Sequence, residues 1–177
     1  MMKEKTIVSV YPSTYGFAYV VLERCKIPVA WGQRDIRGNK NERSVKEVAQ
    51  VVEERRPDVL VIRKCAEYMA DRCKRINELV RQLVELGKEE GIEVAVYSRT
   101  QIREVFRKIG VVTKHEIALA IIDLFPEFGK AKPRPRKAWE HEDYRMGVFN
   151  AMSLIYTYCA SCDCESGLCS HLKTIEF

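Results

Sequence analysis

The sequence lacks any apolar run that approaches the ~18 residues needed to cross a membrane. Its opening stretch, MMKEKTIVSV, also lacks the longer apolar segment and the small-residue cleavage site of a secretory signal. We find no internal repeat and no low-complexity segment, which excludes a repeat array. These absences favour a soluble, globular, cytoplasmic protein that has no membrane partner.

The chain has 177 residues, 46% of them apolar, which is enough to bury the core of one α/β domain. Most of the cysteines lie close to the end of the chain. We therefore expect one domain over residues 1–158, followed by a Cys-rich tail over residues 159–177.

Hydrophobic periodicity predicts a mixture of strands and helices. Strands are expected at about 6–12, 16–23, 26–36, 58–62 and 92–98, the first three as an antiparallel meander. Helices are expected at about 45–56 with Ser44 as the N-cap, 68–90, 99–109, 114–125 and 138–158. Thr113, with Glu116 three residues later, predicts a capping box at the start of the fourth helix. This order predicts an α/β fold in which a mixed sheet is flanked by helices.

Positive charge is concentrated in one segment. The formal net charge is only +5, but residues 130–137, KAKPRPRK, contain five cations and no anion. Two prolines stiffen this segment, so it can present its cations to a polyanion without a large ordering cost. We therefore predict that these side chains contact nucleic acid: Lys130, Lys132, Arg134, Arg136 and Lys137. A second set, with near-helical spacing, is read equally well as a solvated helix face: Arg99, Arg103, Arg107 and Lys108.

Residues 6–23, TIVSVYPSTYGFAYVVLE, run from an apolar strand through a Pro-Ser-Thr-Tyr-Gly turn into a second apolar strand. This hairpin and the element order over residues 5–158 resemble the RuvC-like Holliday-junction resolvases of the ribonuclease-H-like superfamily. The resemblance implies a ribonuclease-H-like fold with a five-stranded mixed sheet. It also implies a DNA-binding homodimer and a nuclease site in which carboxylates hold two divalent metals, Mg²⁺ or Mn²⁺.

Two of the family's carboxylate positions are altered in this chain. Where the resemblance implies an aspartate before the turn, the residue is Tyr11, and a neutral phenol is a poor ligand for a hard cation. Where it implies a glutamate at the end of the central strand, VLVIRK places Arg63, with Lys64 beside it. A guanidinium repels a metal ion but can bind phosphate directly.

The third position, at the start of the last helix, is ambiguous. Asp143 is the best match by its place after His141, with Glu140 and Glu142 nearby, whereas Asn150 is an alternative in which the aspartate has become an amide. We expect Glu140, Asp143, Gly147 and Asn150 to share one helical face. The acidic residues could equally be a charged first turn that complements the helix dipole.

The tail reads CASCDCESGLCSH and is rich in soft metal ligands. It offers a tentative zinc site made of Cys159, Cys162, Cys164, Cys169 and His171. Reduced thiols or disulfides are the alternatives. Cys25, Cys65 and Cys73 are isolated in sequence, although Cys65 and Cys73 could pair.

Three functional hypotheses follow. The leading one is a protein similar to the RuvC-type resolvases that binds nucleic acid, branched or duplex DNA, through Arg63, Lys64 and the 130–137 segment but is catalytically impaired. The second is an active metal-dependent endonuclease with a site rearranged around Glu67, Glu140, Glu142 and Asp143. The third is a non-enzymatic interaction scaffold with a zinc-binding tail.

Overall fold

The computed structural model describes residues 4–66, 69, 71 and 73–161. Its strands are β1 (Ile7–Pro12), β2 (Gly16–Glu23), β3 (Ile27–Asp35), β4 (Val59–Lys64) and β5 (Glu93–Ser98). Its helices are α1 (Lys40–Arg55), α2 (Lys74–Glu89), α3 (Arg99–Arg107), α4 (Lys114–Leu124) and α5 (Met146–Ser161), with a 3-10 helix at Pro126–Ala131. The predicted element order is confirmed.

The five strands form one mixed sheet in the order β3-β2-β1-β4-β5. The first three strands are antiparallel neighbours, whereas β1 with β4 and β4 with β5 are parallel. Val10 pairs with Ile62, and Arg63 pairs with Tyr97, so the carboxyl ends of β1, β4 and β5 meet at one edge of the sheet. Ligands of open α/β sheets commonly bind at such an edge.

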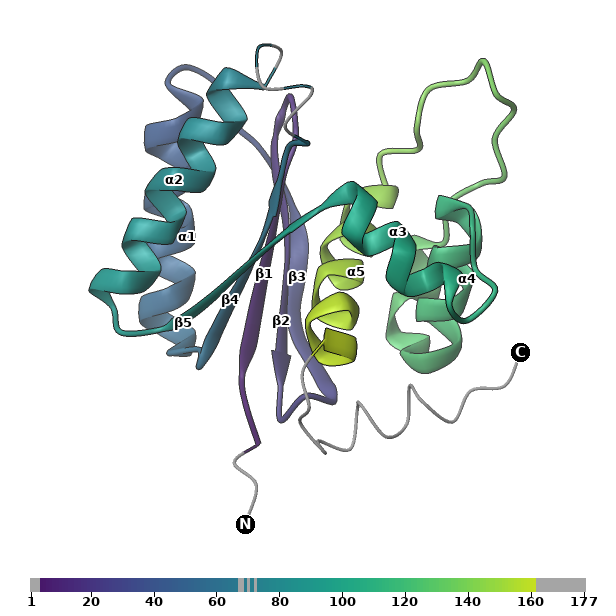
Figure 1. The fold of residues 1–177 in the computed structure, drawn as a ribbon, viewed down its shortest axis with the longest axis horizontal. Coiled ribbons are helices and arrows are strands. Elements are labelled where there is room, and N and C mark those ends of the chain that lie inside the picture. Colours follow the sequence, from purple (N-terminus) through teal and green to yellow (C-terminus); the bar gives the residue numbers. More distant parts are fainter. Residues whose placement is uncertain (1–3, 67–68, 70, 72, 162–177) are drawn as a thin grey trace.

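Helices cover both faces of the sheet (Figure 1). One face packs against α1 and α2 through residues such as Val10, Ile62 and Leu83. The other packs against α5 and α3, and α4 packs against α5, which is buried along most of its length. Successive strand residues point to opposite faces. Tyr11 therefore lies on the α5 side, where it packs against that core.

The start of α5 lies unusually close to β3. A Cβ atom added at Gly147 would come within 1.5 Å of the Gln33 Nε2 atom, so a larger residue would require the Gln33 side chain to move. Gly147 therefore lets this side chain of β3 lie against the first turn of α5.

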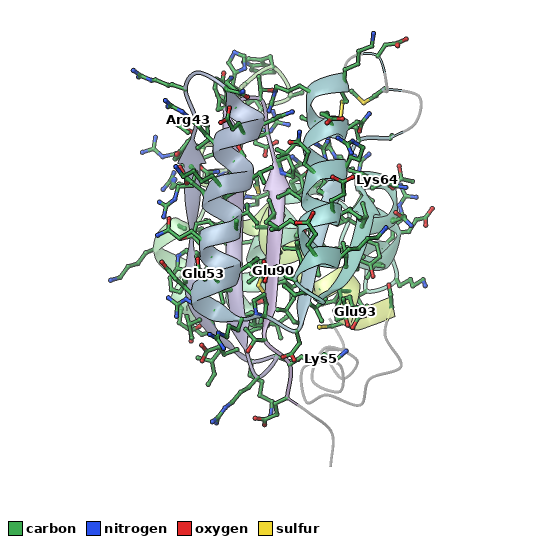
Figure 2. All side chains as sticks on the ribbon, turned by 90° about the vertical axis from the view of Figure 1, so that its left-hand side faces the viewer. Lys5, Arg43, Glu53, Lys64, Glu90 and Glu93 are labelled. Atoms are coloured by element: carbon green, nitrogen blue, oxygen red, sulfur yellow. A yellow bond between two sulfur atoms is a disulfide. The ribbon has the colours of Figure 1, made fainter. Side chains whose placement is uncertain are left out.

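The opposite end of the sheet is closed by a separate polar cluster. Lys5 Nζ donates to Glu93 Oε2 at 3.1 Å and to the Tyr158 hydroxyl at 3.2 Å, and Tyr158 donates to Glu93 Oε1 at 2.9 Å. Lys5 and Glu93 lie at the end away from Lys64 (Figure 2). The end of α5 is thereby attached to the beginning of β5.

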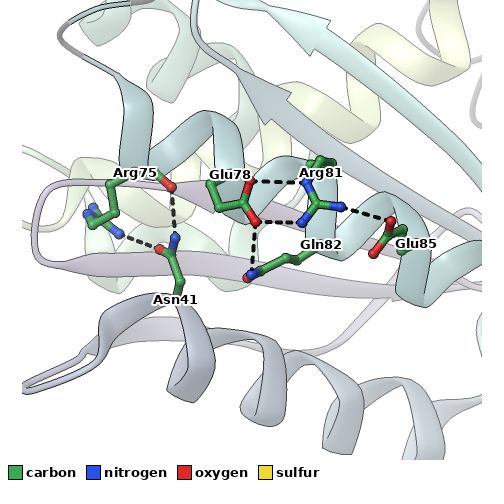
Figure 3. Close-up of polar contacts among 6 residues, drawn as sticks. All are labelled: Asn41, Arg75, Glu78, Arg81, Gln82 and Glu85. Atoms are coloured by element: carbon green, nitrogen blue, oxygen red, sulfur yellow. Dashed lines mark hydrogen bonds and ion pairs between the residues drawn. The ribbon is translucent and has the colours of Figure 1, made fainter.

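Contacts between α1 and α2 also stabilise the turn that follows Tyr11. Asn41 of α1 exchanges two hydrogen bonds with Arg75 of α2 (Figure 3). Arg75 Nη2 also donates to the Ser13 carbonyl oxygen at 2.7 Å. Arg75 therefore connects both helices to the β1–β2 turn.

Three predicted helix starts are wrong, the first two of them at α1 and α5. Asn39, not Ser44, caps α1: its side chain accepts from the Glu42 amide, and Ser44 is buried inside the helix. The last helix begins at Met146 rather than at residue 138, because residues 138–145 form a loop. Glu140 and Asp143 therefore do not share a helical face with Gly147 and Asn150.

The second helix is also shorter than predicted, because it begins at Lys74 rather than at residue 68. Cys73 directly precedes it and forms a disulfide with Cys65, the pairing that the sequence left open. The capping box of Thr113 and Glu116 is confirmed at the start of α4. No helix in the described part of the chain is long and apolar enough to cross a membrane.

Candidate nucleic-acid interface

The carboxyl ends of β1 and β4 lie at the upper end of the sheet in Figure 1. A cleft is lined there by residues of these strand ends and of the start of α5. It consists of two adjoining hollows of about 570 and 520 Å³. The two hollows share six lining residues: Tyr11, Arg99, Lys114, Glu142, Asp143 and Asn150. We call the combined feature the strand-end cleft.

The lining of the strand-end cleft is predominantly cationic. Its arginines and lysines are Arg34, Arg63, Arg99, Arg103, Lys114, Arg134, Arg136 and Lys137. Its carboxylates are Asp35, Glu142 and Asp143, and each already has a partner: Tyr144, Lys114 and Arg145, respectively. The excess of positive side chains favours a polyanionic ligand.

Tyr11 and Arg63 contact each other at the ends of their strands. The Arg63 guanidinium lies over the Tyr11 ring, 5.1 Å from its centroid, and Arg63 Nη1 is 3.5 Å from the Pro12 carbonyl oxygen. Burial raises the pKa of the Tyr11 phenol, and the positive charges of Arg63 and Arg99 oppose that change without reversing it. Tyr11 is therefore neutral at physiological pH.

Lys114 and Glu142 form an ion pair at the centre of the strand-end cleft. Glu142 Oε1 also accepts a hydrogen bond from Asn150 Nδ2 at 3.0 Å. Burial would raise the pKa of Glu142, but the hydrogen bond and charge of Lys114 outweigh it, so the pKa lies below its ordinary value. The Glu142 carboxylate is therefore ionised and already forms an ion pair with Lys114.

The pKa of Lys114 is affected by its burial and by the positive charges around it. Burial lowers the pKa of its ammonium group, and the ion pair with Glu142 opposes this change. Arg99 and Arg63 add to the lowering. The single glutamate thus does not neutralise the cationic side chains around it.

Asp143 and Glu140 are engaged in the loop that precedes α5. Asp143 accepts from the backbone and guanidinium of Arg145 and from the Arg134 amide, and these contacts hold the pKa of its carboxyl well below the ordinary range. Glu140 Oε2 accepts from the Lys137 amide at 2.9 Å. Both carboxylates are used to fold the loop.

Solved structures provide the comparison. A structure of RuvC from Thermus thermophilus matches with a TM-score of 0.64 and 14% identity, over 97% of this chain and 98% of that one. The same enzyme in complex with a Holliday junction substrate matches with a TM-score of 0.63 and 16% identity, over 86% and 90% of the two chains. This chain has the RuvC fold. The predicted ribonuclease-H-like fold is thereby confirmed.

A Fowlpox virus resolvase, in complex with Holliday junction DNA, matches less well, with a TM-score of 0.45 and 16% identity over 89% of this chain and 99% of that one. No protein-family model and no curated protein sequence matches the chain. The likeness to RuvC is therefore one of fold.

Within this RuvC fold, the three positions where the sequence analysis sought metal ligands do come together. Tyr11, Arg63, Glu142, Asp143 and Asn150 all line the same hollow of the strand-end cleft. The convergence follows from the parallel pairing of β1 with β4 and from the position of α5 across them.

The residues present there do not fit a two-metal centre. Hard divalent ions prefer several unpaired carboxylate oxygens. Here Glu142 is paired with Lys114, and Arg63 brings a second cation to the position where a carboxylate was sought. Among the described residues, no group of three or more histidine, cysteine, aspartate and glutamate side chains could hold a metal. Glu67, which the rearranged nuclease site requires, lies outside the described residues.

The predicted nucleic-acid contacts divide into two groups. Arg63, Arg134, Arg136 and Lys137 line the strand-end cleft. The remaining three, Lys64, Lys130 and Lys132, do not line it. Alternation along β4 places Lys64 on the α2 side of the sheet (Figure 2). Lys130 belongs to the 3-10 helix, and Lys132 follows that helix. The extended basic loop therefore begins at residue 132 rather than 130.

The sequence analysis missed Lys114 as a site residue and left open whether Arg99 contacts nucleic acid or belongs to a solvated helix face. Both are first residues of helices, directly after the caps Ser98 and Thr113. Ser98 ends β5 and pairs with Lys64, so Arg99 necessarily starts at the carboxyl edge of the parallel strands. That rule, applied to the predicted strand at 92–98, could have identified Arg99.

The tentative zinc site is not tested by the structure. Cys159 is buried in the last turns of α5. Cys162, Cys164, Cys169 and His171 lie outside the described residues. Zinc binding by the tail therefore stays a prediction.

Proposed function

We propose that this protein binds branched DNA in the strand-end cleft and does so without a divalent metal ion. The proposal includes the loss of two-metal hydrolysis, because the cleft contains built-in cations where metal ions would otherwise neutralise phosphate charge. The protein would then be a junction-binding relative of RuvC rather than a nuclease.

One observation carries this proposal: eight arginine and lysine side chains line the strand-end cleft, and its three carboxylates are all paired already. Duplex DNA is a dense polyanion, and each lysine or arginine that neutralises a phosphate releases counterions and strengthens binding. The surplus of positive charge is at the same edge of the sheet as the basic loop, so one ligand could contact both.

Arg63 is well placed to contact a phosphate. Its side chain lines the strand-end cleft, where Nη1 makes one long hydrogen bond, of 3.5 Å, to the Pro12 carbonyl oxygen. An arginine can offer two parallel donors to phosphate oxygens, which gives both strength and orientation. The stacking contact with Tyr11 holds the guanidinium in position before the ligand arrives.

Support for a branched ligand comes from the fold comparison. The RuvC structure that resembles this chain contains a Holliday junction substrate. We extend that ligand class to this protein for two reasons. Its cleft lies at the carboxyl ends of the parallel strands, and it is lined by the positions where the sequence analysis sought metal-binding carboxylates. The homodimer implied by the resemblance stays a prediction, which sedimentation velocity would test.

The test is a titration of labelled four-way-junction DNA, and of a linear duplex with the same arm sequences, on a native gel in EDTA at near-physiological salt. We expect a discrete complex with the junction at lower protein concentration than with the duplex. Failure to bind either DNA would reject the proposal and leave the fold as a scaffold for a protein partner. Equal affinity for both would retain DNA binding but reject the preference for branches.

A further inference from the structure

Trp139 is the most exposed large hydrophobic side chain among the described residues, with 78% of its surface accessible. Tryptophan is usually well buried, since its large apolar ring gains much from removal from water. The other tryptophan follows that rule more closely: Trp31 is 37% exposed, and its ring packs edge-on against Phe128 at 5.0 Å. Most of the Trp139 side chain is therefore accessible to a ligand.

Trp139 lies in the loop before α5, in a turn that several hydrogen bonds hold in place. The Glu140 amide donates to the Lys137 carbonyl oxygen at 3.1 Å, and the Lys137 amide donates to Glu140 Oε2 at 2.9 Å. Arg136 Nη1 donates to the Glu140 carbonyl oxygen at 2.6 Å. Because these contacts already order the turn, a ligand of Trp139 would meet a prearranged ring at a reduced entropic cost.

The surroundings of Trp139 are charged rather than apolar. Lys137 Nζ lies 5.3 Å from the centroid of the indole ring, and Arg134 and Arg136 line the adjacent cleft. Ala138, the residue before Trp139, is also part of the cleft wall. A protein-docking surface usually has a contiguous apolar patch, whereas a single aromatic ring among cations suits a base flanked by phosphates.

We propose that Trp139 stacks on an unpaired nucleobase at the rim of the strand-end cleft, while Arg134, Arg136 and Lys137 contact the flanking phosphates. This inference rests on the proposed function, since it requires that DNA occupies the cleft. In a continuous duplex both faces of each base are covered by its neighbours. A base at a branch point, gap or single strand has an accessible face, so Trp139 selects for interrupted DNA.

Intrinsic fluorescence provides a direct test, because the chain contains only two tryptophans. The full-length protein is titrated with the four-way junction, with a single-stranded oligonucleotide and with the linear duplex, and native gels are run on the same samples. We expect quenching of the tryptophan emission by the junction and the single strand. The Trp139→Phe variant, which retains only Trp31, should show almost no quenching and should bind nearly as tightly as wild type.

The matched variant is Trp139→Ala, which removes the stacking ring and leaves the basic residues in place. We expect it to weaken binding to the junction and the single strand by about fivefold to a hundredfold, and to leave duplex affinity within about twofold. Junction binding with no change in emission and no loss in Trp139→Ala would overturn the stacking assignment but leave DNA binding intact. Absence of any DNA complex would instead overturn the proposed function.

A protein ligand is the competing assignment, and the same samples address it. If the emission of Trp139 shifts with protein concentration in the absence of DNA, and sedimentation velocity shows self-association that Trp139→Ala abolishes, then a second copy covers the ring. That outcome overturns the nucleobase assignment.

Discussion

Arg63 lies with its guanidinium 5.1 Å from the ring centroid of Tyr11, so the two residues found where the sequence analysis sought carboxylates are each other's neighbours. Such a cation–π contact is worth about 0.5–2 kcal/mol, depending on how far the pair is removed from water. It joins the side chains of two neighbouring strands, β1 and β4, into one local structure. That structure offers a cation, not a carboxylate, to whatever enters the cleft.

Replacing Arg63 by Gln should weaken junction binding without unfolding the protein. A hydrogen bond to a charged group contributes about 1.5–3 kcal/mol, so we expect a loss of roughly tenfold to a hundredfold. Native-gel titrations in EDTA would measure the change, and circular dichroism would check the fold. Lys88→Gln is the matched control, because Lys88 is exposed in the last turn of α2, away from the strand-end cleft. Equal affinities of both variants and wild type would contradict a role for Arg63.

Removing the central carboxylate should have the opposite effect. Glu142→Gln deletes a negative charge from the strand-end cleft and releases Lys114 for phosphate. A unit charge a few ångströms from a phosphate in a water-like medium is worth about 1 kcal/mol, so affinity should rise roughly fivefold. Glu85→Gln on α2, where Glu85 pairs with the exposed Arg81 (Figure 3), is the control and should leave affinity unchanged. Weaker binding by Glu142→Gln would show that the carboxylate itself recognises the ligand.

The basic loop should determine much of the salt dependence. Each phosphate contact contributes roughly 0.9 to the slope of log K against log salt concentration. Substituting Arg134, Arg136 and Lys137 together by Gln should therefore lower the slope by up to about 2.7. Affinity measured between 50 and 200 mM salt, the range in which this effect is large, would give the slope. The control is a triple variant that neutralises three cations of the α1 and α2 layer: Lys46→Gln, Arg55→Gln and Lys88→Gln. Its salt slope should match that of wild type.

The capping box that starts α4 should contribute to stability, and its glutamate should make that contribution depend on pH. Thr113→Ala removes the side-chain cap and should cost about 1 kcal/mol, measured by denaturant unfolding at neutral pH. Hydrogen bonds from the Thr113 and Val112 amides lower the pKa of Glu116 in the folded protein. Its contribution is therefore complete above the unfolded value of about 4.3 and is lost as pH falls through the folded value. The free energy of unfolding of Glu116→Gln should therefore be below that of wild type at neutral pH, and the difference between the two proteins should become smaller in acid.

Divalent ions should not confer nuclease activity. We expect no nicking of junction DNA in Mg²⁺ or Mn²⁺, since the two carboxylates shared by both hollows, Glu142 and Asp143, are paired with Lys114 and Arg145. A labelled junction incubated with each ion and resolved on a denaturing gel would measure this. Nicking that disappears in Asp143→Asn would instead support the rearranged nuclease site. Nicking that persists in that variant would point to a contaminant.

Much of the fold was predictable because its signals are local or periodic. Continuous apolar runs identified β4 and β5, and the spacing of Thr113 and Glu116 identified the start of α4. The start of α1 was missed although Asn39 and Glu42 have the same spacing, because Ser44, which is buried within the helix, also fits an N-cap directly before the apolar stripe.

The parts that could not be predicted depend on contacts between distant residues. The loop before α5 is held by Asp143, whose carboxylate accepts from both Arg134 and Arg145, and nothing in the local pattern distinguishes that role from a charged first helical turn. Lys114 and Glu142 are separated by 28 residues, and only the packed structure reveals their ion pair. The positions of Tyr11 and Arg63 were identified by resemblance, but their mutual contact required the register of β1 and β4.

The contact between Tyr11 and Arg63 also constrains how the sequence can evolve. An aspartate introduced at position 11 alone would form an ion pair with Arg63, and a glutamate introduced at position 63 alone would lie in a cleft that still contains Lys114. Neither single change would leave a carboxylate unpaired for a metal ion. The two positions are thus epistatic, because an unpaired carboxylate at either one would require a second change nearby.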